Sequence, residues 1–303
     1  MYAGNTSELF PLPPGGLMRL SVGYADNTLF LARGANSFAK IKEALERSGA
    51  TLSGRVLEWG CGCGRIIRHA LAHGLDAHGC DINADAIEWC KENIEADRFI
   101  HCGVDPSLPY EDESFDFVYA GSVITHLSLD LQLFWAQELR RILKPGGFML
   151  LTFHGAYHFR HFWGRDTMVV RSINDQPILE VGDHDEGSNN YGVAQTVGAL
   201  DIVTPGFQRK HHTQNNNILG SQDTAVYQKI TVDPPQAYAL LKSSLPIDRS
   251  TAAMTADGKE VAWINGGMAD QLYFLPIDEP ASLASKERYT TMHGLELLRI
   301  VKV

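Results

Sequence analysis

Three glycines at alternate positions follow an apolar run early in the chain. In VLEWGCGCGRIIRHA, residues 56–70, they are Gly60, Gly62 and Gly64, and Glu58 stands two residues before the first of them. Glycine lets a backbone bend and approach a ligand without interference from a Cβ atom. The start of the following helix adds free N–H donors. A carboxylate at this place repels a diphosphate but attracts an ammonium group. The pattern predicts a site for a zwitterionic or cationic ligand.

The spacing of the glycines separates two classes of nucleotide site. Dinucleotide-binding proteins use GxGxxG, whose third glycine permits close packing of a helix against a strand. Here the corresponding position holds Arg65, so the spacing is GxGxG and a nicotinamide dinucleotide is disfavoured. The next apolar run ends in Asp81-Ile82. An acid at that place can accept hydrogen bonds from both ribose hydroxyls, and the apolar residue can lie against an adenine face.

To form one site, these residues must lie at the same edge of a sheet. Short apolar segments alternate with amphipathic ones from residue 55 onward, which is typical of βαβ units and a parallel sheet covered on both faces. A helical pattern over 36–48 precedes them and ends at Gly49. The expected strands are RVLEW, DAHGCD, RFIHCG, FDFVYAGSV and FMLLTF, and the expected helices are GRIIRHALAHG, ADAIEWCKENIEA and DLQLFWAQELRRIL. Ligands of such sheets lie beyond the carboxyl ends of the strands.

The predicted fold class is α/β, a doubly wound Rossmann-like sheet of about seven strands, mostly parallel, with the last strand antiparallel. Residues 1–50 would form an N-terminal arm and a cap helix, and residues 51–232 the cofactor-binding domain. Within that domain, residues 155–220 lack clear periodicity and are interpreted as a substrate-selecting insertion. GFQRKHH and QDTAVYQKI look like paired strands that extend the sheet. Pro234-Pro235 marks the boundary to a small β-rich appendage over 233–303.

Four segments together resemble the class I S-adenosylmethionine-dependent methyltransferases. VLEWGCGCG and GCDINADAIEWC are similar to the first and second motifs, and FDFVYAGSVITHL and ELRRILKPGGFMLLTFHG to the fourth-strand and fifth-strand segments. The resemblance covers residues 20–155, returns at SQDTAVYQK, and is strongest for the small-molecule branch described as methyltransferase domain 11/25. It implies S-adenosyl-L-methionine as cofactor, S-adenosyl-L-homocysteine as product, and methyl transfer by direct displacement.

The same resemblance implies which residues hold the cofactor. Glu58 and the glycine backbone would hold the methionine end, Asp81 the ribose hydroxyls, and Ile82 would flank the adenine. The family usually has an acid near the adenine amino group, and in this chain the acid, Asp105, comes one position late. Main chain alone could make that contact instead. The residues implied are Glu58, Gly60, Cys61, Gly62, Gly64, Asp81, Ile82, Asp105 and Ser122.

Two histidines follow the fourth and fifth expected strands. His126 in SVITHL is the candidate general base for an oxygen acceptor, because imidazole titrates near neutral pH. A structural role for His126, as a helix cap or packed against the sheet, is the favoured interpretation. His154 is the candidate substrate contact, or it ends its strand with a backbone hydrogen bond.

No metal site is predicted. Cys61 and Cys63 lack a second pair at zinc spacing. His154, His158 and His161 would share one face of a helix, but carboxylate partners at the same spacing are missing. An aromatic lid over the substrate is the preferred interpretation of this segment.

The predicted function is methyl transfer to a small-molecule acceptor, with oxygen the first choice of acceptor atom and nitrogen the second. A protein methyltransferase, or a protein that binds S-adenosylmethionine without methylating, is left open. The formal net charge of −10 argues against a broad basic surface, so no nucleic-acid partner is expected.

The sequence also bounds where the protein works. The first ten residues lack the features of a signal peptide, and no run approaches the roughly 20 apolar residues of a membrane span. The five cysteines show no disulfide pattern. A cytoplasmic protein without a membrane partner is predicted, and its oligomeric state is left open, a homodimer included.

Overall fold

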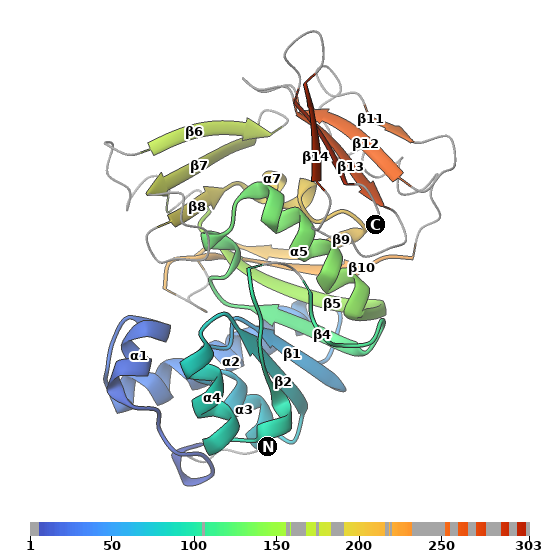
Figure 1. The fold of residues 1–303 in the computed structure, drawn as a ribbon. Coiled ribbons are helices and arrows are strands. Elements are labelled where there is room, and N and C mark those ends of the chain that lie inside the picture. Colours follow the sequence, from blue (N-terminus) through green and yellow to red (C-terminus); the bar gives the residue numbers. More distant parts are fainter. Residues whose placement is uncertain are drawn as a thin grey trace.

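A seven-stranded sheet forms the centre of the computed structural model, which describes residues 6–104, 107–155, 158, 168–173, 176–182, 191–215, 218 and 220–231, and beyond them five strands. The strand order is β3-β2-β1-β4-β5-β10-β9 (Figure 1). The strands are β1 (Arg55–Trp59), β2 (Asp76–Asp81), β3 (Phe99–His101), β4 (Phe115–Ala120), β5 (Leu143–Phe153), β9 (Phe207–Thr213) and β10 (Asp223–Lys229). Strands β1 to β5 pair in parallel, whereas β10 is antiparallel to both β5 and β9. The predicted doubly wound sheet is confirmed.

The helices begin where the sequence supplies a capping side chain. Asp26, Asn83, Ser128 and Thr196 each accept a hydrogen bond from the backbone N–H three residues later, which satisfies a donor that the first helical turn leaves free. The helices are α1 (Gly15–Val22), α2 (Asn27–Arg47), α3 (Ile67–Ala72), α4 (Ala84–Asn93), α5 (Leu129–Ile142) and α7 (Val197–Ile202), with short 3-10 turns η1 (Thr6–Glu8), η2 (Ala96–Arg98) and η3 (Ile124–His126).

The sheet buries apolar side chains on both faces, as a parallel sheet requires. On one face, Phe38 and Ile41 of α2 and Ile67 of α3 pack with Val56 and Phe117 of the sheet. On the other face, helix α5 lies across β4 and β5 (Figure 1). Its Trp135 and Leu139 belong to a second cluster with Leu57, Val118 and Leu151. The two layers fix the carboxyl ends of β1, β2 and β4, where the candidate site lies.

Two helices differ from the expected lengths. Helix α2 starts at Asn27, nine residues before the predicted start at residue 36, because Asp26 supplies its cap. Helix α3 covers only Ile67–Ala72, since the residues before it form turns around the glycines.

The block at 155–220, which lacks periodicity, contains regular structure. Strands β6 (Met168–Ile173), β7 (Gln176–Gly182) and β8 (Tyr191–Gln195) form an antiparallel sheet in that order, and α7 follows. The segment after residue 233 contributes a five-stranded sheet in the order β11-β12-β13-β15-β14. Its strands are β11 (Ala252–Met254), β12 (Glu260–Asn265), β13 (Gln271–Pro276), β14 (Lys286–Thr290) and β15 (Glu296–Ile300). The domain boundaries themselves stay predictions.

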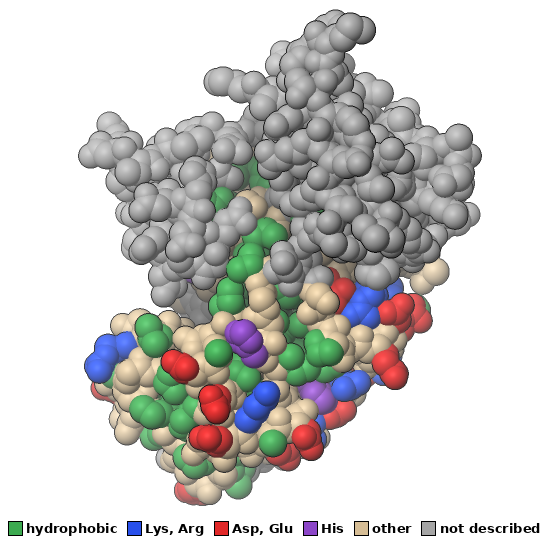
Figure 2. Space-filling view, in the orientation of Figure 1, with side chains coloured by type: hydrophobic (Ala, Val, Ile, Leu, Met, Phe, Trp, Pro, Cys, Tyr) green, Lys and Arg blue, Asp and Glu red, His purple; other side chains and the backbone are tan. Residues whose placement is uncertain are grey.

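The surface of the described part mixes both signs of charge. On the face shown in Figure 2, Lys and Arg side chains are interspersed with Asp and Glu. Among the residues that the structure describes, none of the helices combines the length and apolar character that crossing a membrane would need.

Candidate functional site

A cavity of about 850 Å³ lies at the carboxyl ends of β1, β2 and β4. Its size falls within the range of about 300–1,000 Å³ that is usual for small-ligand sites. Helices α1 and α2, the glycine loop, the end of β2, the segment 121–127 and the loop before β10 supply its lining. The position is the one expected for ligands of an open α/β sheet.

The glycine loop has a conformation that other residues would strain. Gly60, Gly62 and Gly64 have φ angles of 79°, 50° and 79°, in the left-handed region. A Cβ atom on Gly60 would overlap the Val123 side chain, and one on Gly62 would lie 2.9 Å from Ser21. The loop therefore depends on glycine both for its bend and for its close contacts.

Four N–H groups of the glycine loop are hydrogen-bonded within the protein. The N–H groups of Gly60 and Cys61 donate to the Cys80 carbonyl at 2.8 and 3.0 Å, and that of Gly64 donates to the Cys61 carbonyl at 3.0 Å. The N–H of Gly62 donates to Oδ2 of Asp81 at 2.6 Å. These four N–H groups are already hydrogen-bonded within the protein. At these residues the loop therefore gives a ligand room to approach the backbone, but no free donors.

Glu58 lies at the end of β1 and is only 3% exposed. Its Oε2 accepts a hydrogen bond from the Tyr119 hydroxyl at 3.2 Å, and its carboxylate also accepts from the N–H of Ile67 at the start of α3. Burial raises the pKa of Glu58 to about 8, and the nearby Arg65 guanidinium offsets only part of that rise. Glu58 lines the cavity, so a cationic group there would stabilise its ionised form.

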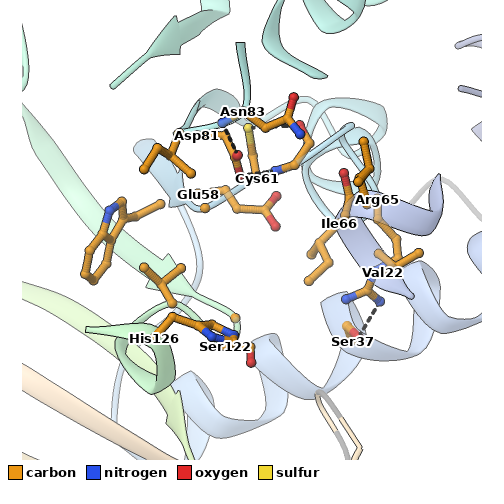
Figure 3. Close-up of a pocket in the computed structure, with 18 of the residues that line it drawn as sticks. Val22, Ser37, Glu58, Cys61, Arg65, Ile66, Asp81, Asn83, Ser122 and His126 are labelled. Atoms are coloured by element: carbon orange, nitrogen blue, oxygen red, sulfur yellow. Dashed lines mark hydrogen bonds between the residues drawn. The ribbon is translucent and has the colours of Figure 1, made fainter. Parts of the chain in front are cut away.

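Arg65, which stands where GxGxxG would have its third glycine, lines the same cavity and is 8% exposed. Its Nη1 donates to the Ser37 hydroxyl at 3.2 Å (Figure 3). Its Nε is buried and, among the described residues, has no hydrogen-bond partner. The same is true of the Tyr24 hydroxyl, which also lines the cavity, whereas the Ser21 hydroxyl beside it hydrogen-bonds to the Cys63 thiol. Buried polar groups are normally satisfied, so these two atoms are available to a polar group of a ligand in the cavity.

Asp81 ends β2 on the opposite side of the cavity from Ser37 (Figure 3). Its Oδ2 accepts from Gly62 and its Oδ1 accepts from the N–H of Asn83 at 2.8 Å. Burial raises the pKa of Asp81. Each oxygen retains a lone pair that can accept another hydrogen bond.

Apolar side chains lie beside Asp81. Ile82 is 45% exposed and lines the cavity together with Val104. Trp135 closes this wall, and its Nε1 donates to the Val104 carbonyl at 2.8 Å. Asp105, the predicted adenine contact, lies outside the described residues.

Ser122 follows β4 and lines the cavity with a φ angle of 63°, which is uncommon for a residue with a side chain. Its N–H donates to Oγ1 of Thr152 at 2.8 Å, and its Oγ accepts from Nε2 of Gln222 at 2.7 Å. Oε1 of Gln222 in turn accepts from the Thr152 hydroxyl at 2.6 Å. Strained residues held by such networks cluster at functional sites.

The two candidate catalytic histidines have different places. His126 ends η3, lines the cavity, and lies near Ser122 (Figure 3). His154 is not among the lining residues, and its Nε2 contacts Gln222 at 3.3 Å. The His154 carbonyl accepts from the N–H of Gln195 at 2.8 Å, so the strand-ending alternative is confirmed. Gln222, which contacts the His154 ring, does line the cavity, and substrate contact by His154 itself stays a prediction.

The histidine triplet cannot be assembled from the described residues. His154 and His158 stack with ring centroids 4.0 Å apart, and burial lowers the pKa of His154 to about 3. His161 lies outside the described part. Within the part of the chain that the structure describes, no group of three His, Cys, Asp or Glu side chains is arranged to hold a metal ion.

A family model described as "Methyltransferase domain" matches residues 57–151. This segment runs from within β1 to within β5 and contains the glycine loop together with Glu58 and Asp81, the acids that line the cavity. The chain carries a methyltransferase domain. It is of the S-adenosylmethionine-dependent class, so the predicted family and cofactor are both confirmed.

Curated relatives match the same part of the chain. The tRNA N(3)-cytidine methyltransferase METTL2 of Gallus gallus is 31% identical over 152 residues, and the match covers 44% of this chain and 41% of the relative. The sterol 24-C-methyltransferase erg6 of Schizosaccharomyces pombe is 29% identical over 176 residues, and the match covers 56% of this chain and 43% of that relative. The match thus spans less than half the length of either relative.

The methyltransferase domain also has similar solved structures. One is the 1,6-didemethyltoxoflavin-N1-methyltransferase of Burkholderia thailandensis with bound 1,6-didemethyltoxoflavin and S-adenosylhomocysteine. It shares 15% identity at a TM-score of 0.45, covering 66% of this chain and 79% of that one.

One expectation about partners is wrong. The chain was expected to have no nucleic-acid partner, yet curated relatives of its methyltransferase domain, such as METTL2, are named as tRNA enzymes. The expectation rested on a net charge of −10, which sums over the whole chain and does not describe any one surface.

Proposed function

We propose that this protein transfers the methyl group of S-adenosylmethionine to a small-molecule acceptor, and that the cavity beside the glycine loop holds the donor. The observation that carries this proposal is the pairing of two polar ends in one cavity. Arg65 and Tyr24 leave buried donor atoms without partners among the described residues at one end, and Asp81 presents a carboxylate at the other. An amino acid joined to a nucleoside has the matching pair of ends.

The residues present fit the donor group by group. The Arg65 guanidinium with the Tyr24 and Ser21 hydroxyls would bind the carboxylate of the amino-acid end, because charge-assisted hydrogen bonds to a carboxylate are strong. Glu58 would face the ammonium group. Asp81 would accept hydrogen bonds from the ribose hydroxyls.

The remaining lining would bind the apolar and reactive parts of the donor. Ile82 and Val104 would cover the adenine faces, and Ser122 and His126 lie where the acceptor would approach. The cofactor supplies a methyl group that is activated by its bond to a sulfonium. The chain's own contribution is to hold donor and acceptor in line, which can account for much of the acceleration of such a reaction.

A titration calorimetry experiment tests the donor assignment. S-adenosylhomocysteine should bind, and NAD should give no heat, because Glu58 and Arg65 suit an amino acid and not a diphosphate. Binding of NAD without a response to S-adenosylhomocysteine would overturn the proposal.

The acceptor is proposed to be a small molecule, methylated on oxygen first and on nitrogen second. An RNA base nitrogen is the second candidate, favoured by the relatives named as tRNA N(3)-cytidine methyltransferases. Transfer of label from a methyl-labelled donor into a cell extract, followed by separation of the low-molecular-mass, RNA and protein fractions, distinguishes them. Label in the low-molecular-mass fraction supports the first proposal, and label in RNA replaces it with the second.

Donor binding should release a proton through Glu58. Its pKa of about 8 keeps the side chain protonated in most ligand-free molecules at pH 7. The donor's ammonium group favours the carboxylate form, so we expect a net release of up to about one proton per molecule bound at pH 7. The measurement is calorimetry of S-adenosylhomocysteine binding in phosphate and in Tris, whose ionisation enthalpies differ.

The Glu58→Gln variant is the control for this experiment, since it has no proton to release. The wild type should also lose stability as pH rises from about 4.5 to 8, because the folded state retains a proton that the unfolded chain gives up in that window. The pH dependence of the variant's unfolding free energy should be flatter. Equal proton release by both proteins would show that Glu58 does not face the ligand's cation.

A further inference from the structure

Strand β8, which comes from the block without sequence periodicity, contacts both candidate histidines through its main chain. Nδ1 of His126 lies 2.9 Å from the carbonyl oxygen of Tyr191. The His154 ring hydrogen-bonds to the backbone of Val193, two residues further along the strand. The N–H of Gln195, at the end of the strand, donates to the His154 carbonyl. The strand thus docks against the tips of β4 and β5.

The contact with Tyr191 decides which nitrogen of His126 carries a proton. A carbonyl oxygen only accepts hydrogen bonds, so Nδ1 must be the protonated nitrogen of the neutral ring. The lone pair then resides on Nε2, which is the acceptor in that tautomer. Because His126 lines the cavity, this ring is placed to accept a proton from a bound molecule.

Gln132 of α5 holds the two sides of this arrangement together. Its Nε2 donates to the carbonyls of Ile124 and Leu127, which flank His126, at 3.1 and 3.0 Å. Its Oε1 accepts from Nε2 of Gln195 in β8 at 2.9 Å. The side chain is 3% exposed, so these bonds are shielded from competing water. One buried amide therefore fixes η3 and β8 relative to each other.

We propose that His126 is the general base of the methyl transfer and that the acceptor atom is a hydroxyl oxygen. This inference rests on the function proposed above. As the oxygen–methyl bond forms, the sulfur–methyl bond breaks and its electron pair stays on sulfur, which becomes the neutral thioether. The hydroxyl proton moves to Nε2 of His126, and the imidazolium later releases it to solvent.

A base of this kind discriminates between acceptor classes. A hydroxyl gains from proton removal during the reaction, typically by about 10² to 10⁴ in rate. A ring nitrogen with a free in-plane lone pair, such as N3 of cytosine, has no proton to lose at the reacting atom. A cavity that presents an oriented imidazole lone pair therefore favours the hydroxyl.

Nitrogen-15 NMR of the whole protein saturated with S-adenosylhomocysteine tests the tautomer directly. With histidine labelled on its ring nitrogens, we expect His126 at pH 8 to show a protonated Nδ1 and an unprotonated Nε2, and the Nε2 resonance to shift when S-adenosylhomocysteine is added. A protonated Nε2 would overturn the proposal, since that nitrogen could not accept a proton. An unchanged resonance would overturn it as well, because the ring would then lie away from the ligand.

Variants test the chemistry. His126→Asn keeps an amide N–H that can bond to Tyr191 but removes the base, so label transfer into the extract should fall about 100-fold while affinity for S-adenosylhomocysteine changes less than about threefold. His73→Asn is the matched control, because His73 also bonds a backbone carbonyl through Nδ1, at 2.7 Å from the His69 oxygen, but does not line the cavity. Transfer by His126→Asn within about threefold of the wild type would refute the base.

The Gln132→Met variant tests independently whether Gln132 orients the His126 ring. It should lower transfer with little change in S-adenosylhomocysteine affinity, and should make the His126 nitrogen resonances report a mixture of tautomers. A single unchanged tautomer in this variant would show that Gln132 does not orient the ring. Failure of the proposed function would look different, because S-adenosylhomocysteine would then give no heat with the wild type.

Discussion

Replacement of Arg65 by methionine should weaken S-adenosylhomocysteine binding about 100-fold. Arg65 is 8% exposed, and the Nε of its guanidinium has no partner among the described residues, so it can bind a carboxylate without first losing an existing bond at that atom. Methionine occupies a similar shape but has no donor. Loss of the Arg65 guanidinium also removes the positive charge that lowers the pKa of Glu58, so that pKa should rise further. Titration calorimetry of the variant at pH 7 measures the effect.

A ligand that lacks the amino-acid end shows whether Arg65→Met weakens binding through the ligand's carboxylate. 5′-Methylthioadenosine lacks the carboxylate, so its affinity should be the same for the wild type and for Arg65→Met within about threefold. Arg47→Met, which removes an exposed guanidinium paired with Glu43, is the matched protein control and should leave both ligands unaffected. If Arg65→Met weakens both ligands equally, Arg65 supports the fold of the loop and does not bind the carboxylate.

Asp81→Ala should weaken donor binding by about 1–3 kcal/mol, which corresponds to a factor of about 5 to 150. The substitution leaves the two ribose hydroxyls of the donor without their acceptor. It also removes the hydrogen bonds that Asp81 accepts from the N–H groups of Gly62 and Asn83, at 2.6 and 2.8 Å. The loop should therefore lose part of its fixed conformation along with the ligand contact. Affinities for S-adenosylhomocysteine and for its 2′-deoxy and 3′-deoxy analogues measure both contributions.

The analogues separate direct contact from loop support. Wild-type protein should bind each deoxy analogue more weakly than the parent, whereas Asp81→Ala should bind all three alike. Asp85→Ala removes an exposed acid in the first turn of α4 and keeps the same change in net charge, so it should bind like the wild type. If Asp81→Ala still distinguishes the analogues, the ribose is recognised by other groups.

The strands and helices of the central sheet could be predicted from the sequence because their signals are local. Apolar runs with caps such as Asn83 and Ser128 between them mark strands and helices within a few residues. The glycine loop and the acid at the end of β2 were predicted for the same reason, since they adjoin one strand each. Their placement around one cavity follows from the parallel order.

Contacts between distant segments could not be predicted in this way. Ser21 of α1 and Tyr24 just after it line the same cavity as Arg65 because this part of the chain folds against the glycine loop. Nothing in GxGxG signals this. The bond from His126 to Tyr191 joins residues 65 positions apart and uses a carbonyl, which every residue has. The contact between His154 and Gln222, which lies just before β10, likewise joins residues 68 positions apart.

The use of a main-chain oxygen at Tyr191 has an evolutionary consequence. Any amino acid at that position would present the same oxygen to His126, so the chemistry of the side chain at 191 does not set the tautomer. The strand is constrained in another way, because Tyr191 and Val193 are no more than 2% exposed and the Gln195 side chain bonds to Gln132. Descendants of such a gene could therefore change residue 191 only within the volume that the core leaves, while the proton-accepting nitrogen kept its orientation.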